Sequence, residues 1–218
     1  MDRKRLLASL LLLWFMAIVI VFFVAGNRGA AVFAFLYAIG YGGLCYRYRG
    51  TIKRFLVSLP GHPALKFFAV AFLVSAAEEV FCFLTGNHVA LPVLWADVLF
   101  CGLVWFGWFG TWYFYLSKRY SYGEQEALLT AGVSGLLYEG TGLVLANPLG
   151  IFALLLIAPF LTLVYSAIFI VPMQLISFTG TRNGRWKYPV SVLLPYIVSV
   201  PITMALFVLF SILGVPLK

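Results

Sequence analysis

Four carboxylates fall inside long apolar stretches of this chain. Glu78 and Glu79 are adjacent in SAAEEVFCF, Asp97 lies in LWADVLFC, and Glu139 lies in GLLYEG. A carboxylate inside a hydrophobic span is costly, and by default it marks a functional site. Several carboxylates left unpaired in a low dielectric must be protonated, hydrated or bound to a cation. The four residues are therefore the candidates for an ion- or proton-binding site.

Two thiols and an imidazole lie close to these carboxylates in the sequence. Cys82 follows Glu78 by four residues and Cys101 follows Asp97 by four, so on a helix each thiol shares a face with a carboxylate. His88 lies in the connection between the two stretches. Carboxylate, thiolate and imidazole groups together can bind a transition metal. Because these spacings are not those of zinc sites, the sequence allows a metal at Cys82, Cys101 and His88 but predicts no cofactor.

The composition requires a membrane around the chain. It is 63% hydrophobic and 10% charged, with a mean hydropathy of +1.02, whereas a soluble domain needs more polar surface. A helix crosses the hydrocarbon layer with about 20 apolar residues. Seven runs meet this length approximately, at residues 6–25, 30–46, 64–85, 91–116, 126–146, 149–175 and 189–215. The sequence predicts an all-α, polytopic integral membrane protein with seven transmembrane helices in one domain, 1–218.

The basic residues predict the orientation of these helices. If the N-terminus is inside, all of the 15 Lys and Arg residues except Arg28 and Lys218 lie at the inner face. The positive-inside rule then places the N-terminus in the cytoplasm and the C-terminus outside, in a multi-pass protein of the cell membrane. The basic, aromatic segment 47–66 is expected to lie against anionic lipid headgroups. Nucleic-acid binding is excluded because no continuous basic face exists.

The four carboxylates are expected to share one layer in the outer half of the bilayer. At about 1.5 Å per residue, each lies roughly 8–12 Å below the outer end of its span. None of the spans carries a Lys or Arg at that depth. On the span of Glu139, small residues at Gly132, Gly135, Gly142 and Ala146 lie on the same face. Such a face packs closely against protein, which should turn Glu139 inward.

Parts of known family motifs occur in the chain, but each is incomplete. The Glu-Glu pair is similar to that of CAAX-type intramembrane proteases, yet Phe83 replaces their arginine and no histidine follows His88. It is also similar to the P-x-E-E motif of membrane lycopene cyclases, with Ala76 in place of proline. GVSGLLYEG resembles the rhomboid G-x-S-G motif around Ser134, but no later helix supplies a histidine. No family is assigned on these residues.

Three functions fit the pattern. The first is a small transporter or channel-like protein with an outward-facing carboxylate pocket, which moves a cation or a proton-coupled solute; the prolines of the last two spans suit this function. The second is a membrane-embedded enzyme, protease- or cyclase-like, that acts on a lipid or isoprenoid by Glu/Asp acid–base chemistry. The third is a non-catalytic assembly subunit, whose stripe of Trp105, Trp108 and Trp112 would contact a partner helix, although such a stripe is usually core packing or lipid contact.

Overall fold

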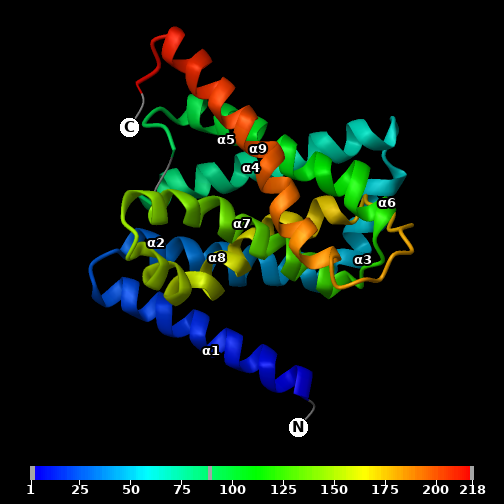
Figure 1. Cartoon of the computed structure of the whole chain (residues 1–218), viewed down its shortest axis with the longest axis horizontal. Helices are drawn as coiled ribbons and strands as arrows, with labels where there is room; N and C mark the ends of the chain where they lie inside the picture. Colours follow the sequence, from blue (N-terminus) through cyan, green and yellow to red (C-terminus); the bar gives the residue numbers. More distant parts are fainter. Residues whose placement is uncertain (1–2, 88–89, 217–218) are drawn as a thin grey trace.

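The computed structural model describes residues 3–87 and 90–216, and these residues form an all-α bundle (Figure 1). Its elements are α1 (Arg3–Val24), α2 (Arg28–Ala34), the π-helical turn η1 (Phe35–Tyr41), α3 (Gly42–Ser58), α4 (Pro63–Thr85), α5 (Leu94–Gly110), the π-helical turn η2 (Thr111–Leu116), α6 (Ser117–Arg119), α7 (Glu124–Ala146), α8 (Gly150–Met173) and α9 (Lys187–Ile212).

Seven helical rods result, because α2, η1 and α3 are continuous and so are α5, η2 and α6. Six of them are long and apolar enough to cross a membrane, and the apolar part of α1, Ser9–Val24, is shorter. The predicted all-α, multi-pass membrane architecture is confirmed. Within the described residues no β-strand forms, and the chain has one isolated bridge, between Tyr120 and Arg182.

The predicted end of the second span at residue 46 is wrong. The helix runs without a break from Arg28 to Ser58, so much of the segment 47–66 is a helical extension of that span. The glycines near its middle do not interrupt it, since one glycine costs a helix only about 1 kcal/mol relative to alanine. Gly42 is instead a packing site, where a Cβ would lie 2.8 Å from the Cβ of Ala167 on α8.

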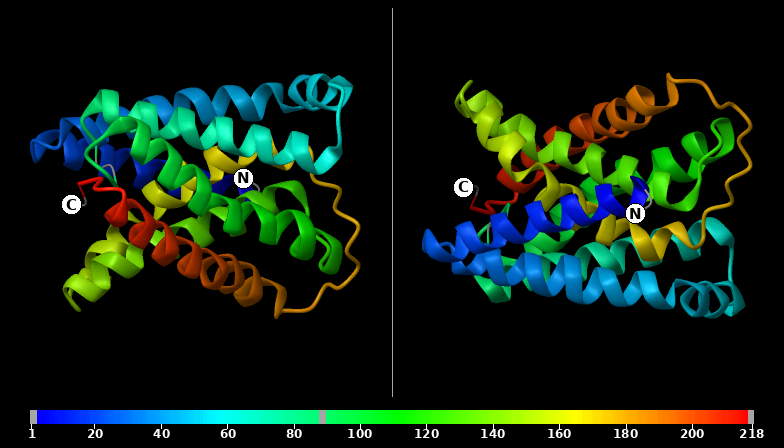
Figure 2. Two further views of the ribbon diagram at one scale, coloured as in Figure 1. Left: turned by 90° about the horizontal axis from the view of Figure 1, so that it is seen from above. Right: turned by 90° about the horizontal axis from the view of Figure 1, so that it is seen from below.

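The two ends of the bundle differ in charge. The C-terminal ends of α1, α4, α7 and α9 lie at one end of the bundle. The α3–α4, α6–α7 and α8–α9 connections lie at the opposite end (Figure 2). The second end, here called the basic end, carries the described basic residues from Arg47 onward. This arrangement agrees with the alternation of inner and outer loops on which the predicted orientation rests.

The tryptophan stripe of α5 and η2 lies inside the chain. Trp105, Trp108 and Trp112 are 4%, 2% and 0% exposed. All three belong to the main core cluster, where Trp108 packs against Phe109 and Trp112 packs against Phe169. The prediction that this stripe contacts a partner helix is therefore wrong: the aromatic spacing marks the core, where large rings bury the most apolar surface.

The small residues of α7 let it pack closely against α8. A Cβ on Gly132 would lie 2.3 Å from the carbonyl oxygen of Thr162, and one on Gly135 would lie 2.1 Å from Cγ of Tyr165. The predicted packing face is thus confirmed at these two glycines. Gly142, farther along α7, has nothing within 4 Å of the Cβ position.

We expect Gly132→Ala to destabilise the protein by about 1–3 kcal/mol, because the new methyl group would collide with the backbone of α8. Gly142→Ala is the matched control, since open space surrounds that site. It should be neutral or slightly stabilising, because alanine favours a helix by up to about 1 kcal/mol. Thermal unfolding in detergent measures both variants. Equal stability of the two would contradict the close α7–α8 contact.

An ion pair with a buried lysine joins α9 to α7 at the basic end. Lys187 Nζ lies 2.6 Å from Glu126 Oε1 and donates to the carbonyl oxygen of Ser121 at 3.0 Å. The other ion pair of the described residues, Arg49 with Glu124, also measures 2.6 Å, but both of its side chains are more than a third exposed. The two ion pairs therefore have the same N···O distance and differ in how far they are buried.

Lys187→Met is expected to cost about 1–3 kcal/mol of unfolding free energy, since it leaves the partners of a buried charged group unsatisfied. Arg49→Met should cost less than about 1 kcal/mol, as is usual for surface pairs. Chemical denaturation in detergent compares the variants. A cost for Arg49→Met as large as that for Lys187→Met would show that burial does not set the strength of these pairs.

Candidate functional site

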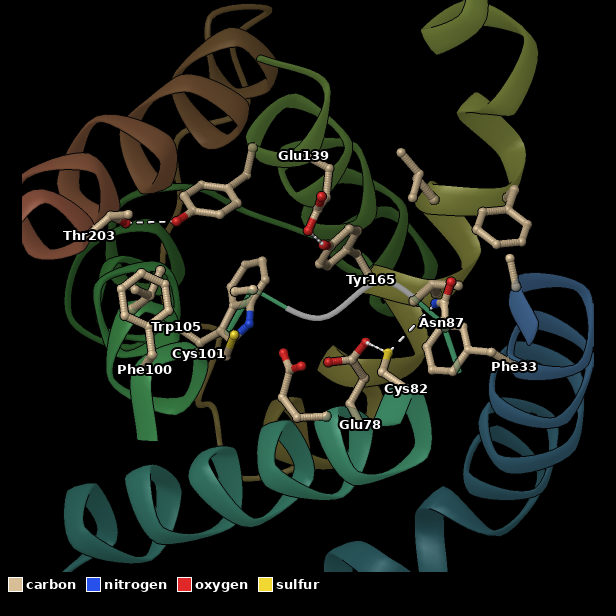
Figure 3. A pocket seen from close by; sticks show the side chains of 18 of the residues that line it. Phe33, Glu78, Cys82, Asn87, Phe100, Cys101, Trp105, Glu139, Tyr165 and Thr203 are labelled. Carbon is tan, nitrogen blue, oxygen red and sulfur yellow. Dashed lines mark hydrogen bonds between the residues drawn. The ribbon is translucent and has the colours of Figure 1, made fainter. Parts of the chain in front are cut away.

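A cavity of about 390 Å³ lies in the half of the bundle away from the basic end. Figure 3 shows the side chains that line it. Its wall includes residues from α1, α2, α4, α5, α7, α8 and α9, and Asn27, Asn87 and Ala90 come from the connections between α1 and α2 and between α4 and α5. The carboxylates of Glu78, Glu79 and Glu139 line it. So do the thiols and most of the neighbouring aromatic rings: Cys82, Cys101, Phe22, Phe33, Phe100, Trp105, Tyr138, Phe160, Tyr165 and Phe207.

Helix α4 brings two carboxylates and a thiol to this cavity. Glu78 and Glu79 are only 8% and 7% exposed, and Cys82 Sγ donates to Glu78 Oε1 at 3.3 Å. The helix ends at Gly86, whose φ of 66° is accessible to glycine at little cost. This turn places Asn87 beside the cavity, where its Nδ2 donates to Cys82 Sγ at 3.7 Å. Figure 3 shows both contacts.

Asp97 lies behind the cavity wall and does not line it. It is fully buried in the first turn of α5, and its Oδ1 accepts the backbone N–H of Leu91 at 2.7 Å. Its Oδ2 has no hydrogen-bond partner among the described residues. Glu79 connects it to the cavity, because ligand atoms of Glu79, Asp97 and Cys101 all lie within 4.8 Å of one another. Asp97 is thus next to the cavity-lining Glu79 but does not line the cavity itself.

Glu139 comes from the opposite side of the cavity, on α7. Its Oε1 accepts the hydroxyl of Tyr165 at 2.6 Å, and Figure 3 shows Glu139 and Glu78 facing the same space. Tyr165 is buried on α8, and its ring fills the room left by Gly135. Glu139 itself is exposed, unlike the pair on α4. The close α7–α8 contact therefore sets the position of the third carboxylate.

Two groups of side chains have the donor atoms for a metal ion. Glu78, Glu79 and Cys82 form one group, and Glu79, Asp97 and Cys101 form the other, each with its ligand atoms within 4.8 Å. These sets include the predicted ligands Cys82 and Cys101. The predicted ligand His88 lies outside the described residues. Oxygen and sulfur donors of this kind suit transition metals better than they suit calcium or magnesium.

Basic side chains do not neutralise this site within the described part of the chain. Both ion pairs formed there, those of Arg49 and Lys187, lie at the basic end. Arg28, the basic residue expected nearest the carboxylates, lies with its guanidinium 5.5 Å from the ring of Phe23 and pairs with no carboxylate. As far as the described residues show, negative charge in the cavity is left to be offset by protons or by a bound cation.

A series of aromatic rings runs from the cavity toward the basic end. We call Trp105, Trp108, Phe169, Trp112 and Tyr122 the aromatic column; successive ring centroids are 5.2, 5.2, 5.1 and 5.2 Å apart. The indole N–H groups of Trp108 and Trp112 are buried without a partner among the described residues. Unpaired buried donors are unusual, and they mark positions where water enters or the packing changes.

At its last member, Tyr122, the column meets the buried residues of the basic end. The Tyr122 hydroxyl contacts the hydroxyl of Ser191 on α9, and Lys187 Nζ lies 5.4 Å from the tyrosine ring centroid. Burial raises the pKa of Tyr122 to about 12. Its hydroxyl therefore stays protonated at neutral pH and holds α9 against the α6–α7 connection.

Three further residues line the cavity that the sequence did not indicate as site residues: Asn87, Tyr138 and Tyr165. Tyr138 donates to or accepts from Thr203 of α9 at 2.7 Å, and it stands next to Glu139 in the sequence. A signal for Tyr165 was present, since a large residue on a neighbouring helix must fill the space beside Gly135.

Comparisons of the chain with protein-family models, with curated proteins and with solved structures found no match in any of the three. The function must be argued from the cavity itself.

Proposed function

We propose that this protein is a small cation transporter coupled to protons, which takes its substrate from the side opposite the basic end. One observation carries the proposal: Glu78, Glu79 and Glu139 line a single cavity, and the described residues supply no basic partner for them. A cation and protons would compete for the same carboxylates. Loading the cation would release protons, and protonation would release the cation.

The bends in the last two helices supply the moving part. Pro159 lies inside α8, and Pro195 and Pro201 lie inside α9. A proline within a helix removes a backbone hydrogen bond and bends the helix at that point. Of the six long helices, α9 has the smallest share of its apolar window buried, yet it supplies Thr203 and Phe207 to the cavity. Movement of α9 past the aromatic column would open the cavity toward the basic end, as alternating access requires.

The orientation completes this proposal. The basic end would face the cytoplasm of a cell membrane, with residues 47–66 near anionic headgroups. The cavity would then open outward, and the aromatic column would be the closed inner gate.

Proteoliposomes loaded with the pH-sensitive dye pyranine test the transport function. An inward gradient of Na⁺, K⁺, Mn²⁺ or benzyltrimethylammonium is applied in turn. At least one of these should make the vesicle interior more alkaline, because protons leave as the cation enters. Glu139→Gln should reduce the signal at least about tenfold, a loss of about 1.4 kcal/mol in free-energy terms.

The matched control is Glu124→Gln, which changes an exposed glutamate at the basic end. It should leave the rate unchanged. Internal pH no different from that of protein-free liposomes under all four gradients would overturn the transport proposal.

A membrane-embedded enzyme is the second candidate, and the apolar, aromatic part of the cavity wall favours it. A lipid or isoprenoid chain could lie along these rings, with Glu78 and Glu79 as proton donor and acceptor. Such an enzyme should retain a hydrophobic molecule through purification. Extraction and mass spectrometry would detect that molecule in wild-type protein and find less of it after a bulky substitution such as Val164→Trp. Protein free of any such molecule would argue against the enzyme.

A further inference from the structure

We infer that the cation is an organic ammonium ion with an apolar body, and not a bare inorganic ion; this inference rests on the proposed transport function. The cavity brings together three features that such a ligand requires. They are an unpaired carboxylate, a set of aromatic faces and a volume larger than an inorganic ion needs.

The carboxylate is Glu79. Glu78 accepts from Cys82 and Glu139 accepts from Tyr165, so each already has a donor. Glu79 lines the cavity and is 7% exposed, and the polar groups beside it among the described residues are the thiol of Cys101 and the carboxylates of Glu78 and Asp97, so no cationic group offsets its charge. A buried polar group without a partner is costly, and an ionised one is more so. A cationic ligand would remove this cost.

The aromatic faces come from three helices. The ring of Trp105 lies 5.4 Å from that of Tyr138 and 5.1 Å from that of Tyr165, centroid to centroid, so the three form one wall of the cavity. Phe33 and Phe100 also line the cavity, as Figure 3 shows. Aromatic faces attract organic cations within about 6 Å, and rings of this kind recognise quaternary ammonium groups in other proteins.

The volume of the cavity is larger than an inorganic ion would fill. At about 390 Å³ the cavity is within the range of about 300–1,000 Å³ that is typical of pockets for small organic molecules. An ion such as Ca²⁺ requires about 6–8 oxygen ligands at 2.3–2.6 Å. Here the apolar rings would face a small ion without contacting it. An ammonium group on an aromatic or branched hydrocarbon body would pair with Glu79 and fill the remaining space.

Binding of benzyltrimethylammonium tests this inference directly, and neopentylbenzene is the neutral control with the same shape. Isothermal titration calorimetry on purified wild-type protein in detergent should show binding of the cation and at least about tenfold weaker binding of the neutral compound. Affinity for the cation should fall as the pH is lowered, because protons compete for the carboxylates. Glu79→Gln should weaken cation binding at least about tenfold, and Glu124→Gln should not.

The outcomes separate this inference from the transport proposal. Equal binding of both compounds, or no binding of the cation, overturns the organic-cation inference; the transport proposal then survives if Na⁺, K⁺ or Mn²⁺ drives proton movement in proteoliposomes. Binding of the cation that depends on Glu79, without any proton movement in proteoliposomes, supports the binding site and contradicts transport. Because the pH titration uses wild-type protein, the test does not depend on any variant folding.

Discussion

Replacing Trp108 with alanine is expected to destabilise the protein by about 3–5 kcal/mol, the usual cost of removing a large aromatic side chain from a core. Trp108 is 2% exposed and lies in the middle of the aromatic column, with ring centroids 5.2 Å from both Trp105 and Phe169. Its loss would leave a cavity between the site and the basic end. Thermal or chemical unfolding in detergent measures the loss of stability.

The same substitution has a functional consequence. If the aromatic column is the closed inner gate, Trp108→Ala should let protons leak through proteoliposomes without any cation gradient. Trp95→Ala is the matched control, since Trp95 is also on α5 but is 57% exposed. It should change neither stability nor leak to a comparable extent. If Trp108→Ala is as stable as Trp95→Ala and leaks protons no faster, the aromatic column neither stabilises the bundle nor blocks protons.

The second large effect is expected from neutralising the adjacent pair on α4. The double variant Glu78→Gln/Glu79→Gln should lose nearly all cation-driven proton movement, to below about one tenth of the wild-type rate. The two side chains are the most deeply buried carboxylates of the cavity wall. Their removal leaves Glu139 as the only acidic group that lines it among the residues the structure describes.

Stability distinguishes this role from simple packing. Glutamine has nearly the same shape as glutamic acid, and a neutral amide costs less to bury than an ionised carboxylate. The double variant should therefore unfold at the same temperature as the wild type or at a higher one. If the two acids only join helices through hydrogen bonds, the double variant will transport normally. Normal transport would contradict the proposed role of the pair.

Hydropathy and charge were sufficient to predict the seven helices and to place the carboxylates in the same half of the bundle. The reason is physical: a membrane span needs a long apolar run, and the rise per residue converts position in that run into depth. The depth estimate placed Glu78, Glu79 and Glu139 together, and they line one cavity.

Other features depend on rotation about the helix axes and on packing, which depth does not describe. Asp97 has a similar depth but turns behind the wall to accept from Leu91. The tryptophans of α5 and η2 form a stripe that could face lipid or protein, and Phe169 of α8 packs against both Trp108 and Trp112. Hydropathy does not predict the continuation of α3 beyond residue 46, because the apolar run ends there, whereas the basic residues that follow are good helix formers.

The most direct test of the account is the side from which Cys101 can be reached. Cys101 lines the cavity and Cys45 lies on α3, so Cys45→Ser/Cys82→Ser protein keeps one thiol in the site. Sealed vesicles of known orientation are treated with a membrane-impermeant methanethiosulfonate that carries either an ammonium or a sulfonate group. Labelling is then measured by mass spectrometry. We predict reaction from the side opposite the basic end, and faster reaction with the ammonium reagent because the carboxylates attract it. Labelling only from the side of the basic end, or equal rates with both reagents, would contradict an outward-facing acidic cavity.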